Sequence, residues 1–208
     1  MMVKTEHFMS ALAAYISESS FEDVVHYINL YHVHLTVTKK RKSVLGDYRH
    51  NALNKNHRIS INGNLNKYEF LITLLHELAH LLTFEQFGNR VDAHGKEWKV
   101  AYKNLLMHFI QKNIFPNDIT QELLKTVHNP AATANGETAL LSVLRNYNVV
   151  KKDNVLTIQE LAEGILFETE KGKIFKKGAK RRKRYECLEI NSGKLYSFSA
   201  IAEVRLIK

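Results

Sequence analysis

Two histidines and a glutamate stand close together in a strongly apolar stretch of the chain. In residues 71–82 the leucines recur every three or four positions, which is the spacing of a buried helix. On such a helix His76 and His80 lie one turn apart, so both imidazoles can reach one metal ion. Glu77 directly follows the first histidine, an offset that lets its carboxylate act on water as a general base instead of coordinating the metal. The arrangement predicts a site for one zinc ion.

A third histidine completes the predicted ligand set. A catalytic zinc ion takes three protein ligands and keeps a fourth position open. His94 stands 18 residues after His76, a distance that one helix and a loop can span. Asp92 and Glu97 compete for the same role, because carboxylate oxygens also bind zinc. A lone histidine on an apolar helix is more often a hydrogen-bonded core residue, but three together favour metal binding.

The segment over residues 33–98 resembles the SprT-like, or Spartan-like, zinc metallopeptidase domain. The matching pieces are three strand-forming stretches, the HELAH segment and the HGKEW segment, at residues 33–38, 46–49, 57–62, 76–80 and 94–98. The resemblance implies an α+β, zincin-like minimal metallopeptidase domain, with helices and a small antiparallel sheet whose hairpin precedes the HExxH helix. It also implies zinc-dependent peptidase activity, which the better understood members direct against proteins attached to DNA.

Aromatic residues and a strand near the predicted site suggest further roles. Tyr48 lies on the returning strand, where its phenol can donate a hydrogen bond to a transition-state oxyanion, although ordinary packing is the commoner role of a strand tyrosine. Trp98 is expected to pack beneath the zinc site and hold His94 in place. The strand over residues 57–62 precedes the predicted metal-binding helix, so we expect a sheet edge to lie against the substrate cleft. Extended peptides commonly bind such edges by strand addition.

Composition predicts a folded chain with two parts. Of the 208 residues 45% are hydrophobic and only 2 are proline, so most of the chain should fold. A small, polar run over residues 129–136 predicts a boundary. We expect a metallopeptidase domain over residues 1–128, a linker over 129–139 and a basic, β-rich subdomain over 140–208. The chain shows no secretory apolar region and no membrane-spanning stretch, so we expect a cytoplasmic protein with no membrane partner.

The C-terminal part is expected to consist of short strands separated by glycines. Residues 184–190 and 194–198 flank a turn at 191–193 and predict a β-hairpin. Residues 201–204 are expected to form a short closing helix. Related chains often carry a cysteine-bearing zinc ribbon in this region, but Cys187 is the single cysteine, so this chain lacks the ribbon.

A strongly basic segment predicts contact with nucleic acid. The net charge is +9, and nine of the fourteen residues over 171–184 are Lys or Arg. Phe175 and Tyr185 stand close by, and nucleic-acid grooves combine cations with aromatic faces in this way, although such a run can also be a solvated loop. A basic turn over residues 39–42 has the same two interpretations. The residues predicted to contact DNA are Lys180, Arg181, Arg182, Lys183 and Arg184.

Three functions are compatible with these patterns. The first is a zinc metalloendopeptidase that acts on proteins associated with DNA. The second is a zinc-containing nucleic-acid-binding or regulatory protein with little peptidase activity, and the third is a peptidase without a nucleic-acid role. Glu77 favours an enzyme that acts on a protein or peptide substrate, because a structural zinc site closes with four ligands and needs no general base. The sequence does not predict the oligomeric state.

Overall fold

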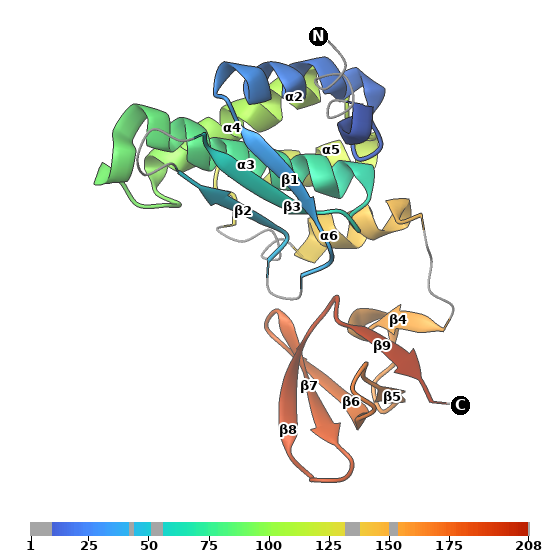
Figure 1. The fold of residues 1–208 in the computed structure, drawn as a ribbon. Helices are drawn as coiled ribbons and strands as arrows, with labels where there is room; N and C mark the ends of the chain where they lie inside the picture. The colour runs from blue at the N-terminus through green and yellow to red at the C-terminus, as the bar shows by residue number, and fades with distance from the viewer. Residues whose placement is uncertain (1–9, 42–43, 51–55, 132–137, 150–153, 208) are drawn as a thin grey trace. The chain divides into compact units, whose positions relative to one another are not determined.

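The chain folds into two compact units, which Figure 1 shows in a computed structural model. The units are Met1–Val149 and Val150–Lys208, and each is described by itself. The structure describes residues 10–41, 44–50, 56–131, 138–149 and 154–207. No helix in this described part combines the length and apolar character that crossing a bilayer requires.

The division between the units falls later than the predicted linker over residues 129–139. Helix α6 (Thr138–Leu144) contacts helix α5 (Asn117–Thr126) and therefore belongs to the first unit. Its leucines at 140, 141 and 144 are buried, and burial of this apolar face explains why the helix joins the larger core. The predicted start of the second part at residue 140 is thus too early. Residues 132–137 of the expected linker lie outside the described residues.

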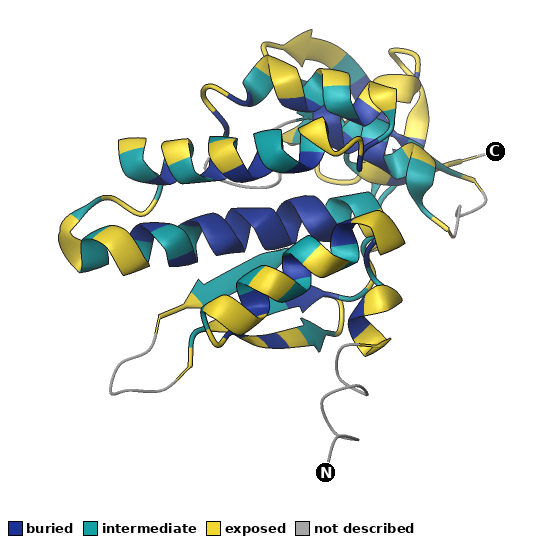
Figure 2. Cartoon of the chain, turned by 90° about the horizontal axis from the view of Figure 1, so that it is seen from above, coloured by how far each residue is buried: buried dark blue, intermediate teal, exposed yellow. Residues whose placement is uncertain are grey.

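Helix α3 (Lys67–Phe87) is the central element of the first unit. It packs against helix α4 (Lys96–Gln111) on one side and against strands β2 and β3 on another. Figure 2 shows the middle of α3 as an almost continuously buried ribbon. Asn66 caps the helix by accepting hydrogen bonds from the backbone N–H groups of Tyr68 and Glu69, and its amide donates to the carbonyl of Leu144. One side chain therefore joins the start of α3 to α6.

Three strands form a mixed sheet next to α3. They are β1 (His34–Thr38), β2 (Gly46–Arg49) and β3 (Arg58–Asn62), in the order β1-β3-β2. The pair β2–β3 is antiparallel, but β1 and β3 run parallel, so β1 and β2 do not form the predicted hairpin. Strand β3 is the middle strand, and its residues Ile59 and Ile61 are buried. Strand β2 has no buried residue and lies at the edge. The prediction that residues 57–62 supply the sheet edge is wrong.

Helix α2 (Glu18–Leu30) covers another part of the first unit. Asp23 on α2 accepts hydrogen bonds from Lys112 at 2.6 Å and from His108 at 3.1 Å, near the end of α4. Val24 and Ile28 of α2 are buried. Charge pairing and apolar packing therefore both hold α2 on the domain.

The second unit is a six-stranded antiparallel sheet. Its strands are β4 (Val155–Thr157), β5 (Leu166–Glu168), β6 (Ile174–Arg181), β7 (Arg184–Glu189), β8 (Leu195–Ser199) and β9 (Glu203–Leu206). Their order is β4-β9-β5-β6-β7-β8. The predicted hairpin is formed by β7 and β8. The short helix expected at 201–204 is wrong, because Val204 is buried between exposed neighbours in strand β9.

Candidate metal centre

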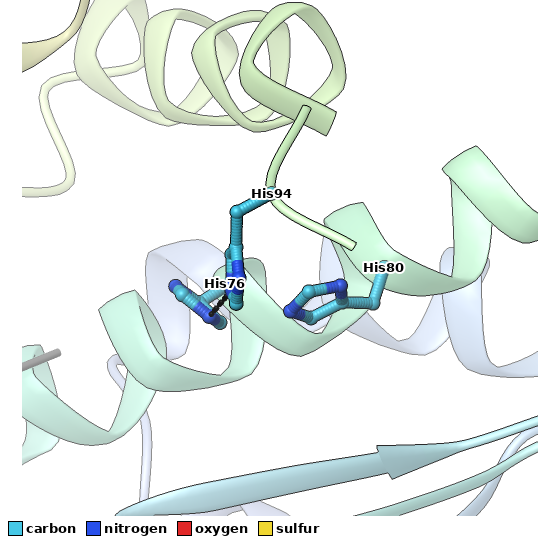
Figure 3. A group of neighbouring side chains, drawn as sticks. All are labelled: His76, His80 and His94. Atoms are coloured by element: carbon cyan, nitrogen blue, oxygen red, sulfur yellow. Dashed lines mark hydrogen bonds between the residues drawn. The ribbon is translucent and has the colours of Figure 1, made fainter. Parts of the chain in front are cut away.

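Three histidines from two segments come together above the middle of α3. His76 and His80 project from α3, and His94 reaches them from the segment that precedes α4, as Figure 3 shows. Their candidate ligand atoms lie within 4.8 Å of one another, and the Nε2 atoms of His76 and His94 are 3.3 Å apart. Two nitrogens on one tetrahedral zinc ion are roughly 3.3 Å apart. Within the described residues, Asp92 and Glu97 are not members of this group.

A tight return of the chain brings His94 to α3. Helix α3 ends at Gly88, whose φ of 61° lies in the left-handed region that favours glycine. A turn of 3₁₀ helix follows at Gly88–Arg90. The backbone N–H of Gly95 then donates to the carbonyl of Asp92, which closes the turn that contains His94. The local backbone therefore sets the position of the third histidine.

Trp98 packs against all three histidines. The indole is fully buried, and its ring centre lies 4.7 Å from His76, 5.4 Å from His80 and 4.6 Å from His94. Tyr102 stacks on the indole, with ring centres 5.0 Å apart. This packing agrees with the predicted role of Trp98, because a rigid aromatic ring restricts the rotamers of the imidazoles.

The protonation of the three histidines suits metal binding. Burial, with smaller contributions from the neighbouring histidines, lowers the pKa of His76 to about 3 and that of His80 to about 4. Burial also lowers the pKa of His94. All three rings are therefore neutral near pH 7, which is the form whose nitrogens coordinate a metal. The donor set fits a metal ion held by three imidazoles.

Glu77 lies in the same place but faces a different environment. Its side chain is buried, and burial followed by the charge of Asp47 raises the pKa of its carboxyl group to about 8. The charge of Arg41 and a hydrogen bond from the backbone N–H of Tyr48 act in the opposite direction. A carboxylate that takes and releases a proton near neutral pH is suited to general base catalysis.

A cleft of about 480 Å³ opens over these residues. One wall is the edge strand β2 with Tyr48. The floor contains His76, Glu77 and His80 of α3. The other wall is the segment between α3 and His94. A free strand edge beside a cleft of this size can accommodate an extended chain.

Arg41 fixes the approach to β2, a role that the sequence did not reveal. Its guanidinium donates to Oδ1 of Asn62 at 2.8 Å, to Oγ of Ser60 at 2.9 Å and to two backbone carbonyls. The amide of Asn62 donates in turn to the carbonyl of Val44. Arg41 therefore holds the segment before β2, and this member of the basic turn is engaged within the protein. Lys42 of the same turn lies outside the described residues.

The five predicted DNA-contacting residues lie at the β6–β7 hairpin of the second unit. Arg184 hydrogen-bonds to Ser197, and Arg181 lies 3.5 Å from Glu186. The ammonium group of Lys180 lies 6.0 Å from the ring centre of Tyr185. The turn itself consists of Arg182 and Lys183, both exposed. The hairpin therefore presents cations at its tip while the flanking residues make contacts within the sheet.

The fold and the site together define an α+β protein with a candidate three-histidine metal centre. The model of the SprT-like family matches residues 9–120, which is more than half of the chain. The chain therefore belongs to the SprT-like family.

Individual relatives match over shorter segments. Protein SprT of Glaesserella parasuis serovar 5 is 61% identical over 31 residues, which cover 15% of this chain and 19% of the relative. Protein SprT of Klebsiella pneumoniae is 52% identical over 42 residues, which cover 20% of this chain and 25% of the relative. The chain thus spans a quarter or less of the length of these curated relatives. No solved structure matches the chain.

Proposed function

We propose that this chain is a zinc-dependent metalloendopeptidase. The observation that carries the proposal is the position of Glu77, whose buried carboxyl lines the same cleft as the three-histidine cluster. A structural zinc site has no use for a general base in an open cleft. Membership of the SprT-like family supports the same function.

Each residue of the cleft has a defined task in this proposal. His76, His80 and His94 hold the zinc ion, which when bound polarises the scissile carbonyl and makes water more acidic. Glu77 takes a proton from the attacking water and returns it to the leaving amine. The phenol of Tyr48, which lines the cleft, donates a hydrogen bond to the developing oxyanion. Strand β2 pairs with the extended substrate backbone.

Replacement of Glu77 by Gln tests the proposal. The amide has nearly the same shape but cannot take a proton, so we expect Glu77→Gln to keep its zinc and to lose roughly 10²–10⁴-fold in activity on an unfolded protein substrate such as labelled casein. Glu22→Gln makes the same change at an exposed position on α2 and should keep full activity. Undiminished cleavage by zinc-loaded Glu77→Gln would contradict the mechanism.

We further propose that the substrates are proteins associated with DNA. The observation that favours this class is the cationic tip of the β6–β7 hairpin, because phosphate neutralisation by Lys and Arg needs no particular base sequence. The alternative function, a zinc-containing nucleic-acid-binding or regulatory protein, predicts salt-sensitive DNA binding together with no cleavage. Parallel assays of cleavage and DNA binding on one preparation separate the two functions.

A further inference from the structure

Three residues form a chain of close polar contacts that leads from a residue of the cleft wall to the protein surface. The phenol oxygen of Tyr48 lies 3.0 Å from Nδ1 of His57, and Nε2 of His57 lies 3.1 Å from a carboxylate oxygen of Glu85. Tyr48 lies on β2, His57 directly precedes β3, and Glu85 lies on α3. Three different elements therefore converge on one imidazole.

The two ends of this chain face different surroundings. The Tyr48 ring lines the cleft and lies parallel to the His80 ring, with an interplanar angle of 3° and ring centres 6.4 Å apart. The His57 side chain is only 14% exposed and packs edge-on against Phe84. The Glu85 side chain is 45% exposed. The largely buried imidazole thus connects the phenol of a residue that lines the cleft with a carboxylate in contact with water.

The chemistry of the partners determines the resting tautomer of His57. A carboxylate only accepts hydrogen bonds, so the Glu85 oxygen 3.1 Å from Nε2 of His57 favours the tautomer that carries its hydrogen on Nε2. In a neutral imidazole Nδ1 then has a lone pair and accepts the hydrogen of the Tyr48 hydroxyl. In this state the single hydrogen of the phenol is directed away from the cleft.

Protonation of His57 reverses the second hydrogen bond. With both ring nitrogens carrying hydrogens, Nδ1 donates to the phenol oxygen and the phenol hydrogen is free to point into the cleft. Burial and the charge of Glu85 raise the pKa of Tyr48, so the phenol stays protonated in either state. Among the residues that the structure describes, the groups that face His57 are the Tyr48 phenol from β2 and the Phe84 ring and Glu85 carboxylate from α3.

We propose that His57, held by Glu85, is a positioning residue that decides whether Tyr48 can donate a hydrogen bond into the cleft. Neutral His57 accepts a hydrogen bond from the phenol. His57 that has gained one proton from water cannot accept it, so the phenol hydrogen is available to the cleft. The catalytic consequence rests on the proposed peptidase function, because an oxyanion in the cleft is the group that would accept it.

The direction of the hydrogen bonds can be measured without any activity. Nitrogen-15 NMR of the zinc-loaded protein should show neutral His57 with hydrogen on Nε2 and not on Nδ1, and protonated His57 with hydrogen on both nitrogens. Tyr48→Phe should shift the Nδ1 resonance, and Glu85→Gln should give a mixture of tautomers. Hydrogen on Nδ1 in the neutral protein, or no response to Tyr48→Phe, would overturn the inference.

The pH profile of cleavage measures the catalytic consequence. In the wild type, kcat/KM should be lower where NMR shows His57 neutral than where NMR shows it protonated, because the donor is withdrawn from the oxyanion. His57→Phe keeps an aromatic ring but not the switch, so its profile should lack this difference. Tyr48→Phe should lose roughly 10²-fold in kcat, and adding His57→Phe to it should have no further effect.

The outcomes separate this inference from the proposed function. A zinc-loaded wild type that cleaves nothing, with the expected NMR pattern, would contradict the peptidase function and support the hydrogen-bond switch. An active wild type whose pH profile is identical in His57→Phe would overturn the switch and leave the peptidase function standing. Independent, additive losses for Tyr48→Phe and His57→Phe would also overturn it.

Discussion

Gly46 packs directly on Glu77: a Cβ atom at residue 46 would lie 2.5 Å from Oε1 of Glu77. The same Cβ would meet the methyl group of Thr73 at 2.8 Å, so neither neighbour leaves room for a side chain. The first residue of the edge strand and the proposed general base therefore adjoin so closely that a side chain at residue 46 would force a neighbour to shift.

Substitution of Gly46 is expected to disturb catalysis more than metal binding. Gly46→Ala must displace either β2 or the carboxyl of Glu77, and a misplacement of about 1 Å can cost roughly 10²-fold in rate. We expect this loss in kcat/KM with zinc content unchanged, measured by cleavage kinetics and metal analysis. The same substitution in Glu77→Gln should cause little further loss, and an equal loss in both backgrounds would show that Gly46 acts through another residue.

Arg41 is expected to support the stability of the first unit. Arg41→Gln removes a guanidinium that hydrogen-bonds to Ser60, Asn62 and Leu45. A hydrogen bond to a charged group contributes about 1.5–3 kcal/mol to the free energy of unfolding. We expect the free energy of unfolding to fall by about 2 kcal/mol, measured by urea denaturation. Lys40→Gln removes the same charge from the exposed neighbour and should change stability little. Equal effects of the two substitutions would contradict the proposed anchoring.

The identity of the third ligand can be tested by metal content. His94→Ala should lower zinc to well below one ion per chain after dialysis, because two imidazoles alone bind zinc weakly. Asp92→Ala and Glu97→Ala should keep stoichiometric zinc. If His94→Ala retains its zinc while Asp92→Ala or Glu97→Ala loses it, the carboxylate that was replaced is the third ligand and His94 is not.

The cationic hairpin is expected to give salt-sensitive binding to DNA. Arg182→Gln combined with Lys183→Gln removes two charges from the exposed tip. If both contact phosphate, the slope of log affinity against log salt should fall in magnitude by about 1.8 for duplex DNA of any sequence. The matched control replaces Lys96 and Lys125 on helices of the first unit. Equal losses in the two variants would assign the effect to net charge instead of to the hairpin.

The sequence alone was sufficient for the parts of the site that depend on local geometry. His76 and His80 could be placed together, with Glu77 beside them, because one turn of a helix brings residues i and i+4 to the same face. The β7–β8 hairpin of the second unit followed from local sequence pattern in the same way, whereas the α+β class was implied by the resemblance. His94 was favoured over Asp92 and Glu97 by residue type and spacing, and the structure groups His94 with His76 and His80.

Only the tertiary structure decided the relationships between distant segments. The parallel pairing of β1 with β3 joins strands that are not consecutive in sequence, so the linear order of the strands misled the prediction of a hairpin. The later division between the units followed from the packing of α6 on α5. Gly46 lies against Glu77, and His57 joins Tyr48 to Glu85, although these residues are far apart in sequence. Such contacts arise from packing and hydrogen bonding between whole elements, which leave no periodic trace in the order of residues.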